Sequence, residues 1–254
     1  MRRTATVAVA AVPLAGYAGT AAAWGNRPLF YALVAEDRWF EMLQVVGYGV
    51  AAVGFAVLAA LVRDRTRLGA LAAVGGAVLF GIVIGEELSW GQRHWDVRLA
   101  AVERVNDQGD LTIHNVGAGL ALSNLGLLAV AVAGTAAPFV HRMEAVRRRL
   151  PTVRGYRPPV WLAGWFGTAA AFTLARLTVL RTPPFNVAKL SEVAEISVAA
   201  GAAVMAVLAV RDALSLFHPA GPRGGGVRTT AAAPRARRQP EAAAQTPQGG
   251  WAPE

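Results

Sequence analysis

Six long apolar stretches constrain the fold of this chain more than any other feature. They cover residues 4–24, 42–62, 68–88, 116–140, 160–180 and 190–210. A helix of about 20 apolar residues crosses the hydrocarbon core of a bilayer, which is about 30 Å thick. The pattern therefore predicts an all-α protein, an integral membrane helical bundle of about six transmembrane helices within residues 1–216.

The composition supports a membrane protein rather than a soluble one. Hydrophobic residues make up 54% of the 254 residues and charged residues 16%, whereas about 25% of residues are charged in an average soluble domain. The apolar stretches are rich in Ala and Gly, which allow membrane helices to pack closely, although a general compositional bias leaves the same pattern. The chain has no cysteine, which excludes disulfides and thiolate metal ligands.

The positive charge is concentrated on alternate connections between these stretches. Arginines precede the first stretch, separate the second from the third and the fourth from the fifth, and follow the sixth. Positive residues mark the cytoplasmic side of membrane proteins, so we predict a protein of the bacterial inner (plasma) membrane with both termini in the cytoplasm. The net charge of +9 then reflects topology and not a nucleic-acid site. In the loop from Arg142 to Arg157, the arginines are expected to contact anionic lipid headgroups. Protein partners cannot be identified from the sequence.

The two ends of the chain have their own interpretations. The first apolar stretch, preceded by Arg2 and Arg3 and ending in three alanines, also resembles a signal peptide, but its length favours an uncleaved span. Residues 217–254 are rich in Pro, Gly, Ala, Gln and Arg. Such a composition buries too little apolar surface to fold, which predicts a disordered cytoplasmic tail.

The acidic residues concentrate on the side opposite to the arginines, and several lie inside the expected spans. Glu86 and Glu87 come about one turn before Trp90, a residue type typical of the membrane interface. Glu195 lies about one turn inside the last span. Ionisable groups at this depth usually face the interior of the bundle or a wet cavity. Arg176 is the one basic residue at a comparable depth, and an ion pair that only joins helices is its alternative interpretation.

Helical spacing brings further polar residues to the same membrane level. Glu41, Gln44 and Tyr48 share one face of the second span, and Glu192 shares a face with Glu195. Glu87 and His94 would share a face if the third helix continued past Trp90. We therefore expect a carboxylate site at the outer ends of the spans, facing out of the cell.

The loop of residues 91–115 supplies the remaining candidates. His114 and Asn115 open the fourth span beside the carboxylate level, and Asp110 or Thr112 would cap that helix. The predicted site thus has four catalytic candidates, Glu86, Glu87, His114 and Glu195, and seven substrate-binding candidates, Glu41, Trp90, Gln92, Arg93, Asn115, Arg176 and Glu192. Carboxylates suit Mg²⁺, Mn²⁺ or Ca²⁺, and an added imidazole admits Zn²⁺. The sequence specifies no metal ligand and no cofactor.

Two motifs in this region carry a resemblance. Glu86-Glu87-Leu88-Ser89-Trp90-Gly91-Gln92-Arg93, followed by Asn106-x-Gln108-Gly109-Asp110-x-x-x-His114-Asn115, resembles the signature of a group of uncharacterised bacterial multi-pass membrane proteins. That resemblance implies a membrane bundle and no particular activity; this chain departs from the pattern at His94 and Asp110. A remoter similarity is to alkaline ceramidase-like membrane hydrolases, although Glu192 and Glu195 stand where those proteins carry a histidine pair.

Three functions fit these observations. The first is a metal-dependent hydrolase or transferase that acts on a lipid-like substrate, with the glutamates and His114 as acid, base or metal ligands. The second is a proton- or cation-coupled transporter whose carboxylates take up and release the ion. The third is a structural or partner-binding membrane protein, in which the polar cluster only stabilises the bundle.

Overall fold

The computed structural model describes residues 3–35, 38–92, 112, 119–149, 157–180 and 183–215. These residues belong to one compact unit, Met1–Pro219, and they contain helices and connecting turns but no strand. The all-helical expectation is therefore confirmed for the described part of the chain. The second unit, Ala220–Glu254, contains most of the predicted tail and lies outside the described residues.

The helices follow the apolar stretches closely in the middle of the chain and less closely at its ends. In chain order they are α1 (Arg3–Ala10), α2 (Val12–Ala22), α3 (Arg27–Val34), α4 (Trp39–Val62), α5 (Arg67–Glu87), α8 (Gly119–Val140), α9 (Glu144–Arg149), α10 (Leu162–Thr178), α11 (Phe185–Ala188) and α12 (Ser191–Ser215). Two 3₁₀ turns, η1 (Ala23–Gly25) and η2 (Ser89–Gly91), follow α2 and α5.

By length and composition, four helical segments of the described chain can cross a membrane. They are Arg27–Val62, Arg67–Glu87, Ala121–Val140 and Phe185–Ser215. A fifth segment joins α1 to α2 through a bend of 45°, next to Pro13 in the first turn of α2. Proline at the start of a helix is well tolerated, but it cannot continue the hydrogen bonding of a preceding helix.

The fifth expected span is the one that falls short of this length. Helix α10 has 17 residues, and prolines flank it on both sides, Pro158 and Pro159 before it and Pro183 and Pro184 after it. A helix of 17 residues is about 25 Å long at about 1.5 Å per residue. Six transmembrane helices therefore remain a prediction.

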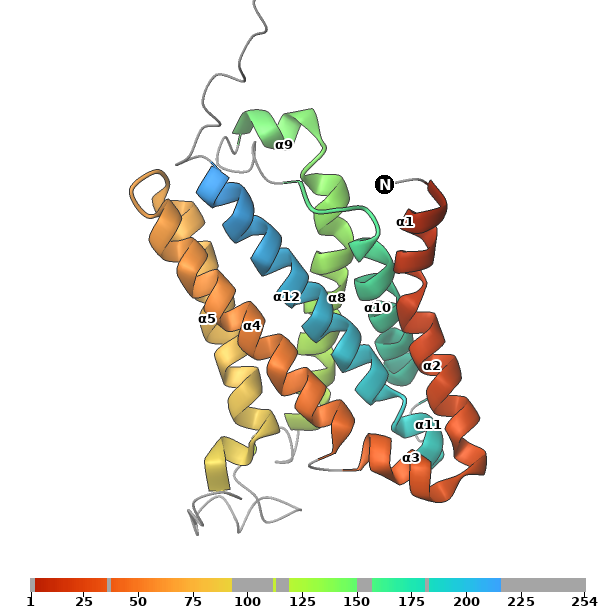
Figure 1. Ribbon diagram of the computed structural model, residues 1–254. Coiled ribbons are helices and arrows are strands. Elements are labelled where there is room, and N and C mark those ends of the chain that lie inside the picture. Colours follow the sequence, from red (N-terminus) through yellow and green to blue (C-terminus); the bar gives the residue numbers. More distant parts are fainter. Residues whose placement is uncertain are drawn as a thin grey trace, which may run out of the picture. The chain divides into compact units, whose positions relative to one another are not determined.

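The helices alternate in direction, so the two kinds of charge lie at opposite ends of the bundle. Figure 1 places the N-terminus, the turn between α4 and α5, α9 and the last turn of α12 at one end. Arg63, Arg65 and Arg142 belong to this end, whereas α3, α11 and the last turn of α5 lie at the other. The glutamates of α5 and of the first turns of α4 and α12 therefore share the second end.

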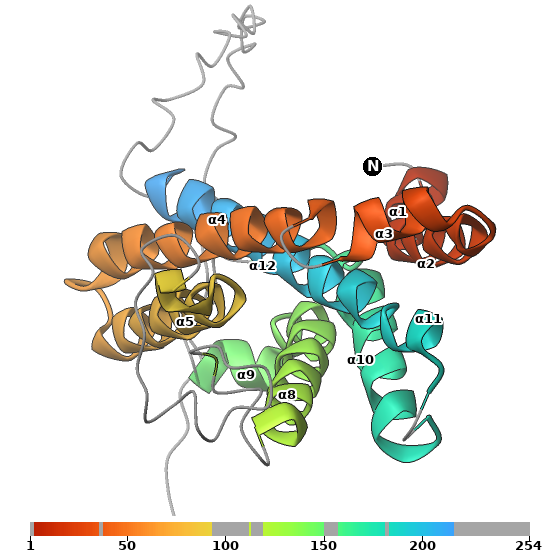
Figure 2. The same ribbon diagram turned by 90° about the horizontal axis from the view of Figure 1, so that it is seen from below.

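Helix α12 is the centre of the bundle and packs against α4, α10 and α8 (Figure 2). Its contact with α4 depends on small residues. A Cβ atom added at Gly47 would lie 2.9 Å from the Cβ of Ala199, and one added at Gly54 would lie 2.8 Å from the Cβ of Ala206. No larger side chain fits at these positions, so the Gly and Ala residues serve close helix packing, as membrane helices commonly use them.

Helix α5 has fewer neighbours than α12. It packs against α4 and against η2, the turn that follows it, whereas α8 packs against α10 and α12. Helices α5 and α8 are not a packed pair. The space between them, in front of α12, is where the site lies.

Candidate functional site

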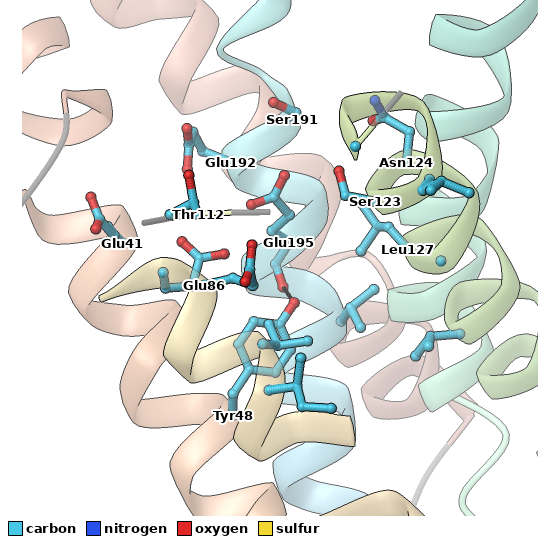
Figure 3. Close-up of a pocket in the computed structure, with 18 of the residues that line it drawn as sticks. Glu41, Tyr48, Glu86, Thr112, Ser123, Asn124, Leu127, Ser191, Glu192 and Glu195 are labelled. Carbon is cyan, nitrogen blue, oxygen red and sulfur yellow. Dashed lines mark hydrogen bonds between the residues drawn. The ribbon is translucent and has the colours of Figure 1, made fainter. Parts of the chain in front are cut away.

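A cavity of about 630 Å³ lies at the glutamate end of the bundle. It is lined by residues of α4, α5, α8, α10, α11 and α12. Five of the lining side chains are carboxylates, Glu41, Glu86, Glu87, Glu192 and Glu195, and two are cations, Arg176 and Lys189. Figure 3 shows the labelled glutamates gathered at one level from three different helices.

The structure thus brings together six of the residues that the sequence selected. Trp90 and Gln92 are described but do not line the cavity. Arg93, His114 and Asn115 lie outside the described residues, so their place in the site stays a prediction. Glu41 is buried, with 9% of its surface exposed, in the first turn of α4.

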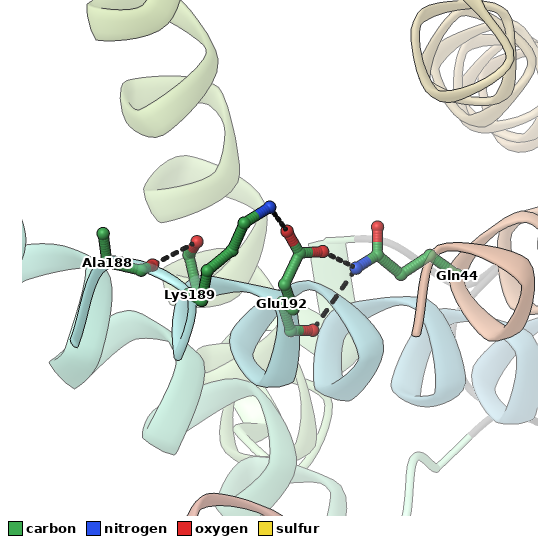
Figure 4. Close-up of polar contacts among 5 residues, drawn as sticks. Gln44, Ala188, Lys189 and Glu192 are labelled. Atoms are coloured by element: carbon green, nitrogen blue, oxygen red, sulfur yellow. Dashed lines mark hydrogen bonds and ion pairs between the residues drawn. The ribbon is translucent and has the colours of Figure 1, made fainter. Parts of the chain in front are cut away.

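Glu192 is held by partners on both sides, as Figure 4 shows. The Nζ atom of Lys189 lies 3.1 Å from its Oε1 atom, and the side-chain amide of Gln44 donates to its Oε2 atom at 2.8 Å. Both side chains of the ion pair are largely shielded from solvent, with 24% and 18% of their surfaces exposed. This network joins the start of α12 to α4 and fixes the Glu192 carboxylate in place.

Glu195, one turn further along α12, has very different surroundings. Its side chain is partly buried, and it lines the cavity. Among the described residues its carboxylate makes no hydrogen bond and no ion pair; the Tyr48 hydroxyl donates to its backbone carbonyl instead, at 3.3 Å. Its electrostatic neighbours are Glu192 and Glu87, of like charge, and the more weakly acting Lys189 and Arg176. The site therefore contains one fixed and one unpartnered carboxylate a single turn apart.

Arg176 likewise faces the cavity without an ion pair among the described residues. The alternative interpretation of Arg176 from the sequence was an ion pair with a glutamate, with the sole role of joining two helices. No such pair occurs within 4.0 Å in the part of the chain that is described. The guanidinium instead acts on Glu195 over a longer distance.

The deeper walls of the cavity are apolar. They consist of Leu79, Phe80, Ile82 and Val83 of α5, Leu122, Leu127 and Val130 of α8, and Val198 of α12. Ser123 and Asn124 of α8 stand opposite the glutamates, at the polar level (Figure 3). The cavity is thus amphipathic, with charged groups at one end and hydrocarbon along the rest.

A left-handed turn ends α5 directly after the two glutamates. The φ angles are 47° at Ser89, 52° at Trp90 and 80° at Gly91, a conformation that is costly for residues with a Cβ atom. The turn folds the Trp90 ring back over Gly85, where an added Cβ would lie 2.8 Å from the ring. The indole N–H donates to the Oε1 atom of Glu86 at 2.7 Å.

This turn bears on one conditional expectation. Helix α5 ends at Glu87 and does not continue past Trp90, so the condition under which Glu87 and His94 would share a face is not met; His94 itself lies outside the described residues. Trp90 remains partly exposed, with 46% of its surface accessible, as an interfacial side chain would be. Its further role is to orient Glu86.

Four polar lining residues, Ser123, Asn124, Lys189 and Ser191, were not singled out from the sequence. Lys189 lies three residues before Glu192, a spacing that itself indicates an ion pair on a helix. Ser123 and Asn124 lie in the second turn of α8 and were counted with the apolar residues of their span. Their face was not recognisable, because most of their neighbours are apolar on every side.

Neither metal ligation nor a known relative identifies the site. Among the described residues, no group of three or more His, Asp or Glu side chains is arranged to hold a metal ion. Comparison with models of protein families, with curated proteins and with solved structures finds no match. The function must therefore be argued from the cavity itself.

Proposed function

We propose that this chain is a multi-pass membrane enzyme that binds a lipid-like molecule in the amphipathic cavity and hydrolyses it by acid–base catalysis. The observation that carries the proposal is the cavity's composition: five glutamates from three helices at one end and apolar side chains along the rest. A lipid has this same division into a polar headgroup and a hydrocarbon chain.

The surface of the bundle supports a bilayer environment. Large apolar side chains are exposed along the outer faces of the long helices, among them Val46, Val53, Leu71, Val78 and Val132. Exposed apolar surface on this scale marks contact with lipid or with another protein. We propose that the chain crosses the plasma membrane of a bacterial cell six times, with the arginine end of the bundle in the cytoplasm. In this orientation the site opens to the outer side of the membrane.

The separation of α5 and α8 supports entry from the bilayer. Both helices line the cavity with apolar side chains, yet they pack against different neighbours. An acyl chain can therefore pass between them without leaving an apolar environment. A headgroup that follows it arrives at the glutamates, which lie at the ends of the helices.

Glu195 is the group we assign to proton transfer. Acid–base catalysis commonly uses neighbouring carboxylates with unlike surroundings, and Glu195 is unpartnered among the described residues whereas Glu192 is fixed. In the hydrolysis, the oxygen of a water molecule bonds to the acyl carbon while Glu195 accepts a proton from that water. The bond from the acyl carbon to the leaving oxygen or nitrogen then breaks, and the same proton passes to the leaving atom.

Binding is tested with a dansyl-labelled monoacylglycerol added to the protein in phosphatidylcholine nanodiscs. We expect saturable binding that is lost in Leu127→Trp, because the larger ring fills the apolar wall. Leu125→Trp is the matched control: Leu125 lies on the same helix, is 52% exposed and does not line the cavity. Equal binding by both variants would contradict the proposal.

Turnover is tested by mass spectrometry of lipid esters and amides incubated with the same nanodiscs. Release of a free acid from at least one of them is the expected result. Saturable binding without turnover, together with proton flux in proteoliposomes, would instead identify a coupled transporter.

A further inference from the structure

The charge of the cavity points to the chemistry of the headgroup. Among the described lining residues, five carboxylates face two cations, a formal excess of three negative charges. One cation, Lys189, is already engaged by Glu192. Concentrated charge of one sign in a low-dielectric cleft attracts ligands of the opposite sign and repels those of its own.

The unpartnered Glu195 carboxylate shows where a cation would be bound. It is partly buried, lines the cavity (Figure 3) and lies next to the like charges of Glu192 and Glu87. A buried charge without a partner is costly. A positive group on the ligand would lie near several carboxylates at once, and it would relieve the repulsion among them.

The kind of cation follows from the groups that meet it. Ionised carboxylates only accept hydrogen bonds, and a primary ammonium offers three N–H donors. A quaternary ammonium offers none and is recognised by cages of aromatic rings. The described aromatic side chains of the lining are Tyr48, Phe80 and Phe185. Tyr48 and Phe80 stack on each other, with ring centroids 5.6 Å apart, and are not arranged as a cage around a cation; the Tyr48 hydroxyl is already bonded to the Glu195 carbonyl. The lining therefore suits the N–H donors of a primary ammonium better than the methyl groups of a quaternary ammonium.

We propose that the cavity selects an amphiphile with a primary-ammonium headgroup, bound by the glutamates of α5 and α12 with its alkyl chain between α5 and α8. This inference rests on the binding step of the proposed function and not on its chemistry. An anionic headgroup, such as a phosphate, is disfavoured by the same charges.

The experiment is competition against the dansyl-labelled monoacylglycerol in phosphatidylcholine nanodiscs at neutral pH, with empty nanodiscs as the blank. The competitors share one alkyl chain: dodecylamine, dodecyltrimethylammonium, dodecanol and dodecyl phosphate. We expect dodecylamine to displace the probe at a concentration about ten-fold lower than dodecanol or the trimethyl compound, since one charge-assisted hydrogen bond contributes about that factor. Dodecyl phosphate is expected to displace least.

Two variants connect this preference with the carboxylates. Glu195→Gln should remove most of the advantage of dodecylamine over dodecanol and leave the affinity for dodecanol unchanged. Glu144→Gln, on the exposed helix α9, is the control and should keep the full preference.

The outcomes separate this inference from the proposed function. Equal displacement by the amine and the alcohol, a preference for the phosphate, or an amine preference that survives Glu195→Gln would overturn the headgroup assignment alone. A probe that does not bind at all, or that binds equally to Leu127→Trp, would overturn the proposed function as well.

Discussion

The two sides of α12 have different roles: one packs closely against α4, and the other lines the cavity. The side that faces α4 carries alanines, and at Ala199 and Ala206 these touch glycines so closely that no further atom fits. The side that faces the cavity carries Glu192 and Glu195 at the polar level and Val198 below them. Close packing on one side holds the helix in place, and this allows the other side to line an open space that no helix fills.

The glutamates repeat this contrast over a single turn. Glu192 lines the cavity but has a structural role, because Lys189 and Gln44 attach it to the rest of the bundle. Glu195 has no such attachment among the described residues and contributes to the cavity. A carboxylate in a span is thus not a functional group by its depth alone; its partners decide which role it has.

The largest expected effect concerns the unattached carboxylate. Glu195→Gln keeps the shape of the side chain and removes its capacity to transfer a proton, so turnover of the cleaved lipid should fall by at least about a hundred-fold. The thermal unfolding temperature should not fall, because no hydrogen bond or ion pair of a described residue is lost. Mass spectrometry of the product and a thermal melt measure the two effects. A lower melting temperature with unchanged turnover would assign Glu195 to structure.

A substitution in the packed contact should have the reverse effect. Gly54→Ala adds a Cβ atom 2.8 Å from that of Ala206, and such overpacking costs about 1–3 kcal/mol of unfolding free energy. Gly49→Ala on the same helix is the matched control, because an added Cβ meets nothing within 4 Å there. We expect the first variant to melt earlier and the second not to. Probe binding by the folded fraction should be unchanged in both, and selective loss of binding in Gly54→Ala would break the comparison.

The smallest effect is expected at the ion pair that fixes Glu192. Lys189→Met keeps the length of the side chain but leaves the Glu192 carboxylate with Gln44 as its remaining partner among the described residues, which should cost about 1 kcal/mol of stability. Arg148→Met is the control, since its ion pair with Glu144 is mostly exposed, at 75% and 61%. Thermal melts of the two variants in parallel give the comparison. An equal shift in both would mean that the Lys189 pair is no more structural than a surface pair.

Much of the helical frame could be predicted from sequence, because a long apolar run leaves few alternatives. The expected 68–88 span corresponds to α5, Arg67–Glu87, and the expected 116–140 span to α8, Gly119–Val140. Breaks within apolar runs were harder to locate. The separate helix α3 begins where Asn26 accepts a hydrogen bond from the Leu29 amide, a capping signal that its apolar surroundings obscured.

The sequence was sufficient to predict the depth at which the carboxylates lie along the helices, but not which residues pair with them. Distance along a helix gives depth in a membrane, which is why Glu41, Glu86 and Glu195 were expected to meet. Which carboxylate is paired depends on the packing of different helices, and no spacing within one helix reports that. The ion pair of Lys189 was the exception, because it lies within one turn. The left-handed turn at Trp90 was not expected, since strained backbone has no simple residue pattern apart from Gly91.

The attachment of α5 has a mechanical consequence. Within the described chain this helix packs chiefly on α4 and on its own terminal turn, so its position is set mainly by one interface and by the short Arg63–Thr66 link. Rotation of α5 about that link would change the width of the cavity mouth while the contacts of α12 with α4, α8 and α10 stay intact. Such a rotation would also move Glu86 and Glu87, so the width of the entrance and the arrangement of the carboxylates would change together.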